Sequence, residues 1–361
     1  VADVARLRKK GSADEVAVAL GIADARRRAA VKGLEADQLV ADPGSIEKAS
    51  GRWVADYKAA RLAEHLAGAG LGPVMFDLGC GIGADTRALA RAGLQPIAVD
   101  CRPLFAWLAQ INSGGRPVVA DITRMNLSLA PAHADPDRRD RQGRRARRLN
   151  DYQPGPAFID QLMEQSPAAA IKLGPGLDVQ ELPETTPPRE LEWISEAGRL
   201  VQLIAWSAAA ADTGRRATRL DQANAESFTG NTGEFIDHRP ESSWLLEPDP
   251  ALERSDLLGA FAGSHDLGEL HPGLGLLTGQ AVPDSTLVTP FRRLDEMAWR
   301  PEKVRDRLAE LGAGIVEVKT RGGAVDPDTA QKDLRGDGQR PLTVFVLRMG
   351  RPVRALICER P

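Results

Sequence analysis

Short apolar runs alternate with helical patterns through the middle of the chain. The runs have the length of buried strands and lie at 73–78, 96–99, 117–120, 127–134 and 168–173. A regular alternation of strand and helix predicts a parallel sheet with right-handed crossover connections. We therefore expect an α/β fold with a Rossmann-like arrangement in this region.

Two more strands are predicted after the central runs. They lie at 200–206 and 216–220, and a turn at 212–214 joins them. We expect them to close the sheet as an antiparallel hairpin. Residues 222–242 are rich in polar and small side chains, which predicts a loop or linker.

The two ends of the chain have other patterns. Residues 1–66 predict helices, and one of these is expected to begin at Ile46 after a Ser45 cap and to run through Leu62. After 241, helices and strands predict a small α/β domain with an antiparallel sheet. The predicted helices and strands lie at 251–261, 301–311, 315–319, 342–347 and 353–357. The predicted parts are a helical region (1–66), a sheet domain (67–240) and a C-terminal domain (241–361).

Composition excludes several classes of protein. The chain has 361 residues, 42% of them hydrophobic, and a net charge of −3, so nucleic-acid binding must rest on local charge. Its three cysteines have no paired spacing, which argues against a disulfide framework and against a metal site. No run approaches the ~18 apolar residues of a spanning helix. We expect a cytoplasmic protein without a signal peptide.

A glycine-rich turn follows the first strand. Gly79, Gly81 and Gly83 alternate with apolar residues, and a helix follows them. Glycine allows left-handed backbone angles and close approach of a ligand, and a helix start offers free N–H groups. These features predict a nucleotide-like cofactor site. With Ala84 in the last position, the stretch also satisfies the dinucleotide-binding pattern.

Acidic residues follow four of the predicted strands. Asp77 precedes the glycines and can take the ammonium group of an amino-acid ligand, and Asp100 can take a ribose diol. Asp121 with Ile122 can hold an adenine, and Asp135 ends the fourth strand. Single acids at such places usually only cap helices. Four in succession point to one binding edge of a parallel sheet.

These residues resemble the class I S-adenosylmethionine-dependent methyltransferases. The similarity lies in Asp-x-Gly-x-Gly-x-Gly at 77–83, in Asp100 and Asp121, and in Asp135-Pro136. The resemblance implies S-adenosylmethionine as the cofactor. The glycine loop and Asp77 would then hold its methionine part, Asp100 its ribose, and Asp121 with Ile122 its adenine.

Asp85 is similar in position to a polar residue that lines the cofactor site of the related cap-trimethylating enzymes.

The C-terminal part resembles the THUMP-like domain of a group of bacterial methyltransferases. The similar segments are 318–323, 334–338 and 343–348, and the core carries the group's Asp-Pro-x-Arg-Arg at 135–139 with Gly-Arg at 143–144. The THUMP name implies RNA binding by analogy. Basic residues outnumber acidic ones from Phe291 onward, which is consistent with such a partner.

The Asp135-Pro136 pair resembles the Asp-Pro-Pro-aromatic signature of amino-group methyltransferases. In those enzymes the acid or the backbone carbonyl accepts hydrogen bonds from the target amine. Here Arg138 or Arg139 stands where the aromatic residue would be, and an arginine can stack on a base or clamp a phosphate. Alternatively, Asp135 caps a helix and the arginines form ion pairs. No cysteine lies near the motif in the sequence, so methylation of pyrimidine carbon 5 is not expected.

An arginine run follows the motif. Seven arginines lie between 138 and 148, and Arg144 and Arg145 are candidate substrate-binding residues together with Lys172. Such a run can follow a nucleic-acid backbone, or it can be a solvated loop. Lys172 can equally be a surface charge at a strand end.

The favoured function is methylation of a base nitrogen of RNA, either ribosomal or transfer RNA, with RNA as partner. A small-molecule or protein methyltransferase, whose arginines would bind a carboxylate or phosphate, is a second hypothesis. A binding protein that keeps the fold without turnover is a third.

Overall fold

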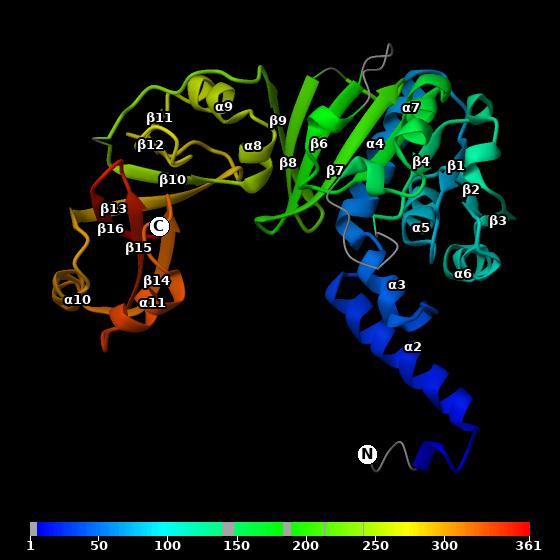
Figure 1. Cartoon of the computed structure of the whole chain (residues 1–361), viewed down its shortest axis with the longest axis horizontal. Coiled ribbons are helices and arrows are strands. Elements are labelled where there is room, and N and C mark those ends of the chain that lie inside the picture. Colours follow the sequence, from blue (N-terminus) through cyan, green and yellow to red (C-terminus); the bar gives the residue numbers. More distant parts are fainter. Residues whose placement is uncertain (1–5, 139–147, 183–188, 213, 241) are drawn as a thin grey trace. The chain divides into compact units, whose positions relative to one another are not determined.

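The chain folds as two compact units, which Figure 1 shows with their helices and strands. The first unit ends at Ala225 and the second begins at Glu226. The computed structural model describes residues 6–138, 148–182, 189–212, 214–240 and 242–361. The predicted boundary lay at 240, and the predicted helical region 1–66 belongs to the first unit.

A nine-stranded sheet, counted over the described residues, has the order β3-β2-β1-β4-β5-β7-β6-β8-β9, and its first eight strands in that order form the centre of the first unit. Its strands are β1 (Val74–Leu78), β2 (Gln95–Asp100), β3 (Arg116–Val119), β4 (Ala132–Ala134), β5 (Ala168–Leu173), β6 (Arg189–Glu196), β7 (Arg199–Ala208), β8 (Gly214–Asp221) and β9 (Asn224–Gly230). Neighbours among β1 to β5 are parallel, whereas β7 is antiparallel to β5 and β6. The predicted parallel sheet with an antiparallel closing hairpin is confirmed.

The strands of that hairpin differ from the prediction. β7 pairs with β6, and β6 lies between β7 and β8 and is parallel to β8, so the predicted pairing of 200–206 with 216–220 is wrong. β6 escaped prediction because Glu190 and Glu192 interrupt its apolar pattern, although both are fully buried. β9 likewise lies within the segment predicted as a loop.

Helices precede and connect these strands. The first unit contains α2 (Ala13–Val31), α3 (Pro43–Lys48), α4 (Arg52–Gly68), α5 (Ala84–Arg91), α6 (Pro103–Ser113) and α7 (Pro156–Gln165). The helix predicted from Ile46 through Leu62 is in fact two helices, because the chain is extended at Ala49 and Gly51. Asp42, not Ser45, caps α3 by accepting hydrogen bonds from the N–H groups of Gly44 and Ser45.

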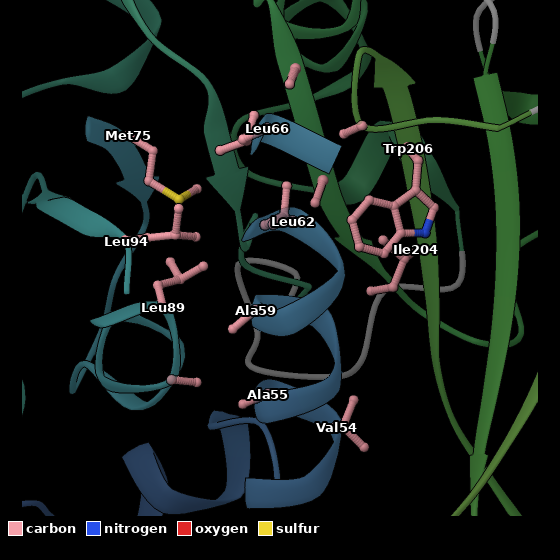
Figure 2. Packing of buried hydrophobic residues seen from close by; sticks show 14 of the residues in the cluster. Val54, Ala55, Ala59, Leu62, Leu66, Met75, Leu89, Leu94, Ile204 and Trp206 are labelled. Carbon is pink, nitrogen blue, oxygen red and sulfur yellow. The ribbon is translucent and has the colours of Figure 1, made fainter. Parts of the chain in front are cut away.

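α4 is the helix around which the core of the first unit packs. Figure 2 shows it between Leu89 and Leu94 on one side and Ile204 and Trp206 on the other. Its own contribution is small or apolar side chains at helical spacing, namely Val54, Ala55, Ala59, Leu62 and Leu66, all at most 2% exposed. The N-terminal helical region therefore shares one core with the sheet.

α4 also carries two buried cations toward the sheet, Lys58 and Arg61. The guanidinium of Arg61 donates to Glu190 at 2.5 Å and to Glu192 at 2.7 Å. Its carbon Cζ also lies 4.4 Å from the centre of the Trp206 ring. Since a buried carboxylate is costly without a partner, Arg61 makes the charged strand β6 compatible with the interior.

The second unit is built on a seven-stranded sheet, again over the described residues, with the order β11-β12-β10-β13-β16-β15-β14. The strands are β10 (Trp244–Pro248), β11 (Gly268–Glu269), β12 (Leu277–Gly279), β13 (Val288–Ala298), β14 (Ala313–Arg321), β15 (Arg340–Arg348) and β16 (Val353–Glu359). β14 and β15 are parallel, so the prediction of an antiparallel sheet holds for the other pairs only.

The helices of the second unit are α8 (Pro250–Arg254), α9 (Leu258–Ser264), α10 (Pro301–Glu310) and α11 (Pro327–Leu334). The helix predicted at 251–261 is interrupted at Asp256, whose φ is 61°. α11 makes the crossover between β14 and β15 that a parallel pair needs. Val304 and Leu308 of α10 and Leu334 of α11 are buried in one core with β14, β15 and β16.

None of the helices in the described part of the chain combines the length and the apolar character that crossing a membrane requires.

Replacing Arg61 by methionine should lower the free energy of unfolding by about 3–5 kcal/mol, because Glu192 would stay buried without its cation and Glu190 would keep only Arg216. Denaturant unfolding followed by circular dichroism measures this. Arg27→Met is the matched control, because its side chain is 77% exposed and its ion pair with Asp24 should contribute less than about 1 kcal/mol. Equal stability losses in the two variants would contradict the role given to Arg61.

Candidate active site

A cavity of about 440 Å³ opens at the carboxyl ends of β1, β2 and β4 in the first unit. Its walls come from the glycine turn after β1, the turns after β2 and β3, the segment after β4, and α3. A volume of this size suits a small-molecule cofactor. The cavity contains nine of the predicted site residues, namely Gly79, Gly81, Asp85, Asp100, Asp121, Ile122, Asp135, Pro136 and Arg138.

The three glycines of the turn have different tasks. All have left-handed φ angles, 75° at Gly79, 54° at Gly81 and 83° at Gly83. A side chain at Gly79 would stand 2.9 Å from the carbonyl oxygen of Asp135, and one at Gly83 would stand 2.8 Å from Ala109 of α6. Only Gly81 lines the cavity without a neighbour in its way, so a ligand can approach the backbone there.

Asp100 ends β2 and lies on the cavity wall beside the glycine turn. One carboxylate oxygen accepts from the N–H of Arg102 at 2.9 Å, and the other accepts from the N–H of Gly81 at 3.2 Å. Burial raises the pKa of Asp100 above the usual value of an aspartate, although the two backbone hydrogen bonds oppose this. A ribose diol could donate to the remaining lone pairs of this carboxylate.

Asp121 and Ile122 lie on the cavity wall after β3. Asp121 is exposed and begins a short 3-10 helix, where its carboxylate accepts from the N–H of Thr123 at 3.0 Å. The hydrogen bonds from Thr123 lower the pKa of Asp121. Ile122 gives this end of the cavity an apolar surface, which suits the face of an adenine.

Asp85 reaches the cavity from the first turn of α5. Its carboxylate accepts from the hydroxyl of Ser50 at 2.8 Å and forms an ion pair with the ammonium group of Lys58 at 2.8 Å. Burial would raise the pKa of Asp85, but the ammonium groups of Lys58 and Lys172 outweigh it and hold that pKa far below the usual range. The cavity therefore contains a fixed, ionised carboxylate.

Asp77 does not line the cavity. It is fully buried, one oxygen accepts from the hydroxyl of Thr86, and the other lies 2.8 Å from Nδ1 of His133. The prediction that Asp77 takes the ammonium group of a ligand therefore does not fit this arrangement. The sequence placed Asp77 at the right strand end, but its side chain lies on the same face of β1 as that of Met75, which packs into the core.

Asp135 and Pro136 form the wall after β4. The backbone N–H of Asp135 donates to the Leu78 carbonyl at 3.0 Å, and one carboxylate oxygen accepts from Nζ of Lys172 at 2.7 Å. Lys172 is 1% exposed and does not line the cavity, so it is neither a surface charge nor a direct substrate contact. It instead fixes the carboxylate of Asp135.

Arg138 is half-buried on the same wall. Its guanidinium lies near Gly174 and Tyr152, since a side chain at Gly174 would stand 3.4 Å from one of its nitrogens and 2.9 Å from the Tyr152 hydroxyl. Within the described ranges no carboxylate forms an ion pair with Arg138. The predicted site residues Arg139, Arg144 and Arg145 lie outside the described residues.

Several residues of the site were not predicted from the sequence. Lys48 of α3 lines the cavity and pairs with Asp137 at 2.8 Å across 89 positions in the chain. Its carbonyl also accepts from Lys172 at 3.2 Å. Lys58 and Tyr152 are buried, and they contact residues 75 and 22 positions away in the chain, His133 and Gly174. No local pattern marks such contacts, because only the fold brings their partners together.

The cysteines lie closer to the site than expected. Cys80 and Cys101 both line the cavity, so distance in sequence from Asp135 was a poor guide. Burial, with the charges of Asp77 and Asp100, raises the pKa of Cys80 far above that of an ordinary thiol. Cys80 is therefore held as a thiol and not as a nucleophilic thiolate. No group of histidine, cysteine and acidic side chains in the described ranges could hold a metal ion.

The polar and apolar groups that line the cavity match the parts of S-adenosylmethionine. An open glycine backbone and an ionised carboxylate lie at one end, Asp100 lies in the middle, and Ile122 lies at the apolar end. These match an amino acid, a ribose diol and an adenine in turn. Asp135 and Arg138 are left to contact the molecule that accepts the methyl group.

The chain is similar to known proteins over most of its length. It is 31% identical over 340 residues to an uncharacterized S-adenosylmethionine-dependent methyltransferase of Mycobacterium tuberculosis H37Rv, covering 90% of each chain. The corresponding protein of strain CDC 1551 matches equally. Residues 288–360 match the family described as THUMP domain-like. A candidate methyltransferase from Porphyromonas gingivalis W83 has a similar fold, with a TM-score of 0.66, 16% identity and coverage of 88% of this chain and 83% of that one.

Asp100→Ala should weaken binding of S-adenosylmethionine by about 1–3 kcal/mol, because ligand hydroxyls would lose their acceptor. Since the pKa of Asp100 is raised, affinity of the native protein should fall on acidification before an ordinary aspartate would titrate. Isothermal titration calorimetry at several pH values measures both. Asp178→Ala is the control, because Asp178 also begins a 3-10 helix but lies outside the cavity wall. Unchanged affinity in Asp100→Ala would contradict the assignment.

Proposed function

The chain belongs to the S-adenosylmethionine-dependent methyltransferases, and on this premise we propose that it methylates a base nitrogen of RNA. The observation that carries the proposal is the acceptor end of the cavity. There, a carboxylate fixed by a buried lysine lies on the same wall as an arginine without an ion-pair partner among the described residues. A hydrogen-bond acceptor beside a planar cation suits an amino group on a flat ring.

Bound S-adenosylmethionine supplies an electrophilic methyl group, so the protein has to position the nucleophile and manage its proton. Asp135 accepts a hydrogen bond from the acceptor amine and thereby orients the nitrogen lone pair. Lys172 holds Oδ2 of Asp135 at 2.7 Å, which leaves Oδ1 for the amine. The same carboxylate is placed to receive the proton that the methylated nitrogen releases.

The carbonyl oxygen of Asp135 adds a second acceptor at the same place. It lies directly against Gly79, where no side chain could fit. The rigid Pro136 follows, so the backbone at this point is constrained. Two acceptors on one residue match the two hydrogens of an exocyclic amino group.

Arg138 supports the choice of a nucleotide acceptor. A half-buried guanidinium can stack on a base or bind a phosphate in a bidentate manner. The arginine run that begins at Arg138 and the THUMP domain-like match at 288–360 both favour RNA over a small molecule. The RNA base nitrogen is thus the acceptor that these features favour together.

Purified protein should transfer labelled methyl groups from S-adenosylmethionine to bulk RNA, and nucleoside mass analysis should place them on base nitrogens. Asp135→Asn should lower kcat by about 10²–10⁴-fold, as expected for loss of a positioned acid–base group. Asp151→Asn is the matched control, being an exposed aspartate outside the cavity wall. Labelling of a small molecule or a protein but not of RNA would contradict the proposal. Cofactor binding without any transfer would show a binding protein.

Arg138→Ala should raise the KM for RNA by about tenfold, because a charge-assisted contact to base or phosphate is lost. Steady-state kinetics with the labelled RNA measures this. Arg148→Ala is the control, since Arg148 is exposed and lies in the same run but outside the cavity wall. Should Arg148→Ala have the larger effect, the run would bind RNA without Arg138 acting at the acceptor.

A further inference from the structure

Two lysines are almost completely buried in the first unit, and each lies behind one carboxylate of the cavity. Lys172 contacts Asp135, as described above, and Lys58 contacts Asp85. Both lysines are 1% exposed and neither lines the cavity. A buried ammonium group is costly unless an opposite charge lies beside it. Each of these lysines therefore needs its carboxylate partner in the folded protein. The Lys58 pair has no part in the acceptor chemistry proposed above.

Lys58 is the centre of a connected polar network. Its Nζ lies 2.8 Å from Oδ1 of Asp85 and 3.1 Å from Nε2 of His133. Nδ1 of His133 lies 2.8 Å from Oδ1 of Asp77. The network thus runs from Asp77 of β1 through His133 of β4 and Lys58 of α4 to Asp85 at the cavity.

The network assigns one hydrogen-bonding state to His133. An ammonium group can only donate, so Nε2 of His133 accepts from Lys58. Nδ1 must then carry the proton and donate to Asp77, which makes the ring neutral. Asp77 and His133 are register partners on adjacent strands, and α4 covers them. They therefore form a rigid base on which the Lys58 ammonium rests.

Asp85 keeps the capacity to bind a ligand. A carboxylate has about four lone-pair sites, and Asp85 uses one on Lys58 and one on the hydroxyl of Ser50. Ser50 is held in turn by the side-chain amide of Gln202 at 3.1 Å. Both oxygens are thus fixed, and the carboxylate still lines the cavity beside Gly81.

We propose that Asp85, and not Asp77, receives the ammonium group of S-adenosylmethionine, and that Lys58 is the residue that positions Asp85 for this task. This inference rests on the cofactor of the proposed function but not on its RNA acceptor. It also explains why the first acid of the glycine motif is turned away from the cavity, since Asp77 anchors His133 beneath Lys58.

The other acids on the cavity wall are already committed. Asp100 receives two backbone N–H groups next to the predicted ribose position. Asp135 is held by Lys172 at the acceptor end. Asp121 is exposed after β3, Asp137 pairs with Lys48, and Glu47 of α3 pairs with Arg28. Asp85 is the fixed carboxylate that remains on the glycine-turn side.

Calorimetry with two ligands tests the inference. S-adenosylmethionine carries the ammonium group, whereas 5′-methylthioadenosine lacks the amino-acid part. Asp85→Asn and Lys58→Met in the full chain should each weaken S-adenosylmethionine binding by about tenfold or more and change 5′-methylthioadenosine binding by less than about twofold. Lys58→Arg keeps the cation and should restore most of the lost affinity.

Two controls separate this role from general damage. Lys319→Met removes a partly buried lysine that pairs with Glu247 in the second unit and should affect neither ligand. Asp178→Asn removes the charge of an aspartate outside the cavity wall and should leave the ratio of the two affinities unchanged. If Lys58→Met does not fold by circular dichroism, Asp85→Asn carries the test.

If Asp85→Asn and Lys58→Met weakened the binding of both ligands equally, the inference would be overturned. The ion pair between Lys58 and Asp85 would then have a structural role only. A selective loss of S-adenosylmethionine affinity in Asp77→Asn that exceeds the loss in Asp85→Asn would assign the ammonium group to Asp77. Because no RNA is present, an error about the acceptor would leave these results unchanged.

Discussion

The first unit depends on matching buried charges across the contact between α4 and the sheet. Carboxylates on β1, α5 and β6 are buried, and burial of an unpaired charge is prohibitively costly. α4 supplies Lys58 to one group and Arg61 to the other while its small apolar residues fill the space between. The helices before β1 are consequently part of the catalytic unit, and the positions of the cavity carboxylates follow from the position of α4.

The same pairing of buried charges occurs at two carboxylates of the cavity. On the cofactor side Lys58 fixes Asp85, and on the acceptor side Lys172 fixes Asp135. The glycine turn brings Gly79 against the backbone of Asp135. Two carboxylates are thus held in place before any ligand arrives, which suits a displacement in which the protein contributes mainly orientation. α3 completes the wall through Lys48 and its ion pair with Asp137.

Local patterns predicted much of the fold. The parallel strands, the glycine turn and helices such as α5 and α10 have apolar periodicity or Pro and Gly signals at their ends, and they lie where expected. β6 was missed because its buried glutamates look polar in sequence, and their partner Arg61 is far away along the chain. Asp77 shows the same limit at the site. A motif gives the strand end at which an acid lies, but the packing of α4 decides which face its side chain takes.

The most direct test of the whole account is a crystal structure of the full chain with S-adenosylhomocysteine. The ligand should lie in the described cavity with its ammonium group within about 2.7–3.2 Å of Asp85, its ribose hydroxyls at Asp100 and its sulfur toward Asp135. A ligand bound elsewhere, or one whose ammonium group contacts Asp77 after a rearrangement of His133 and Lys58, would contradict it.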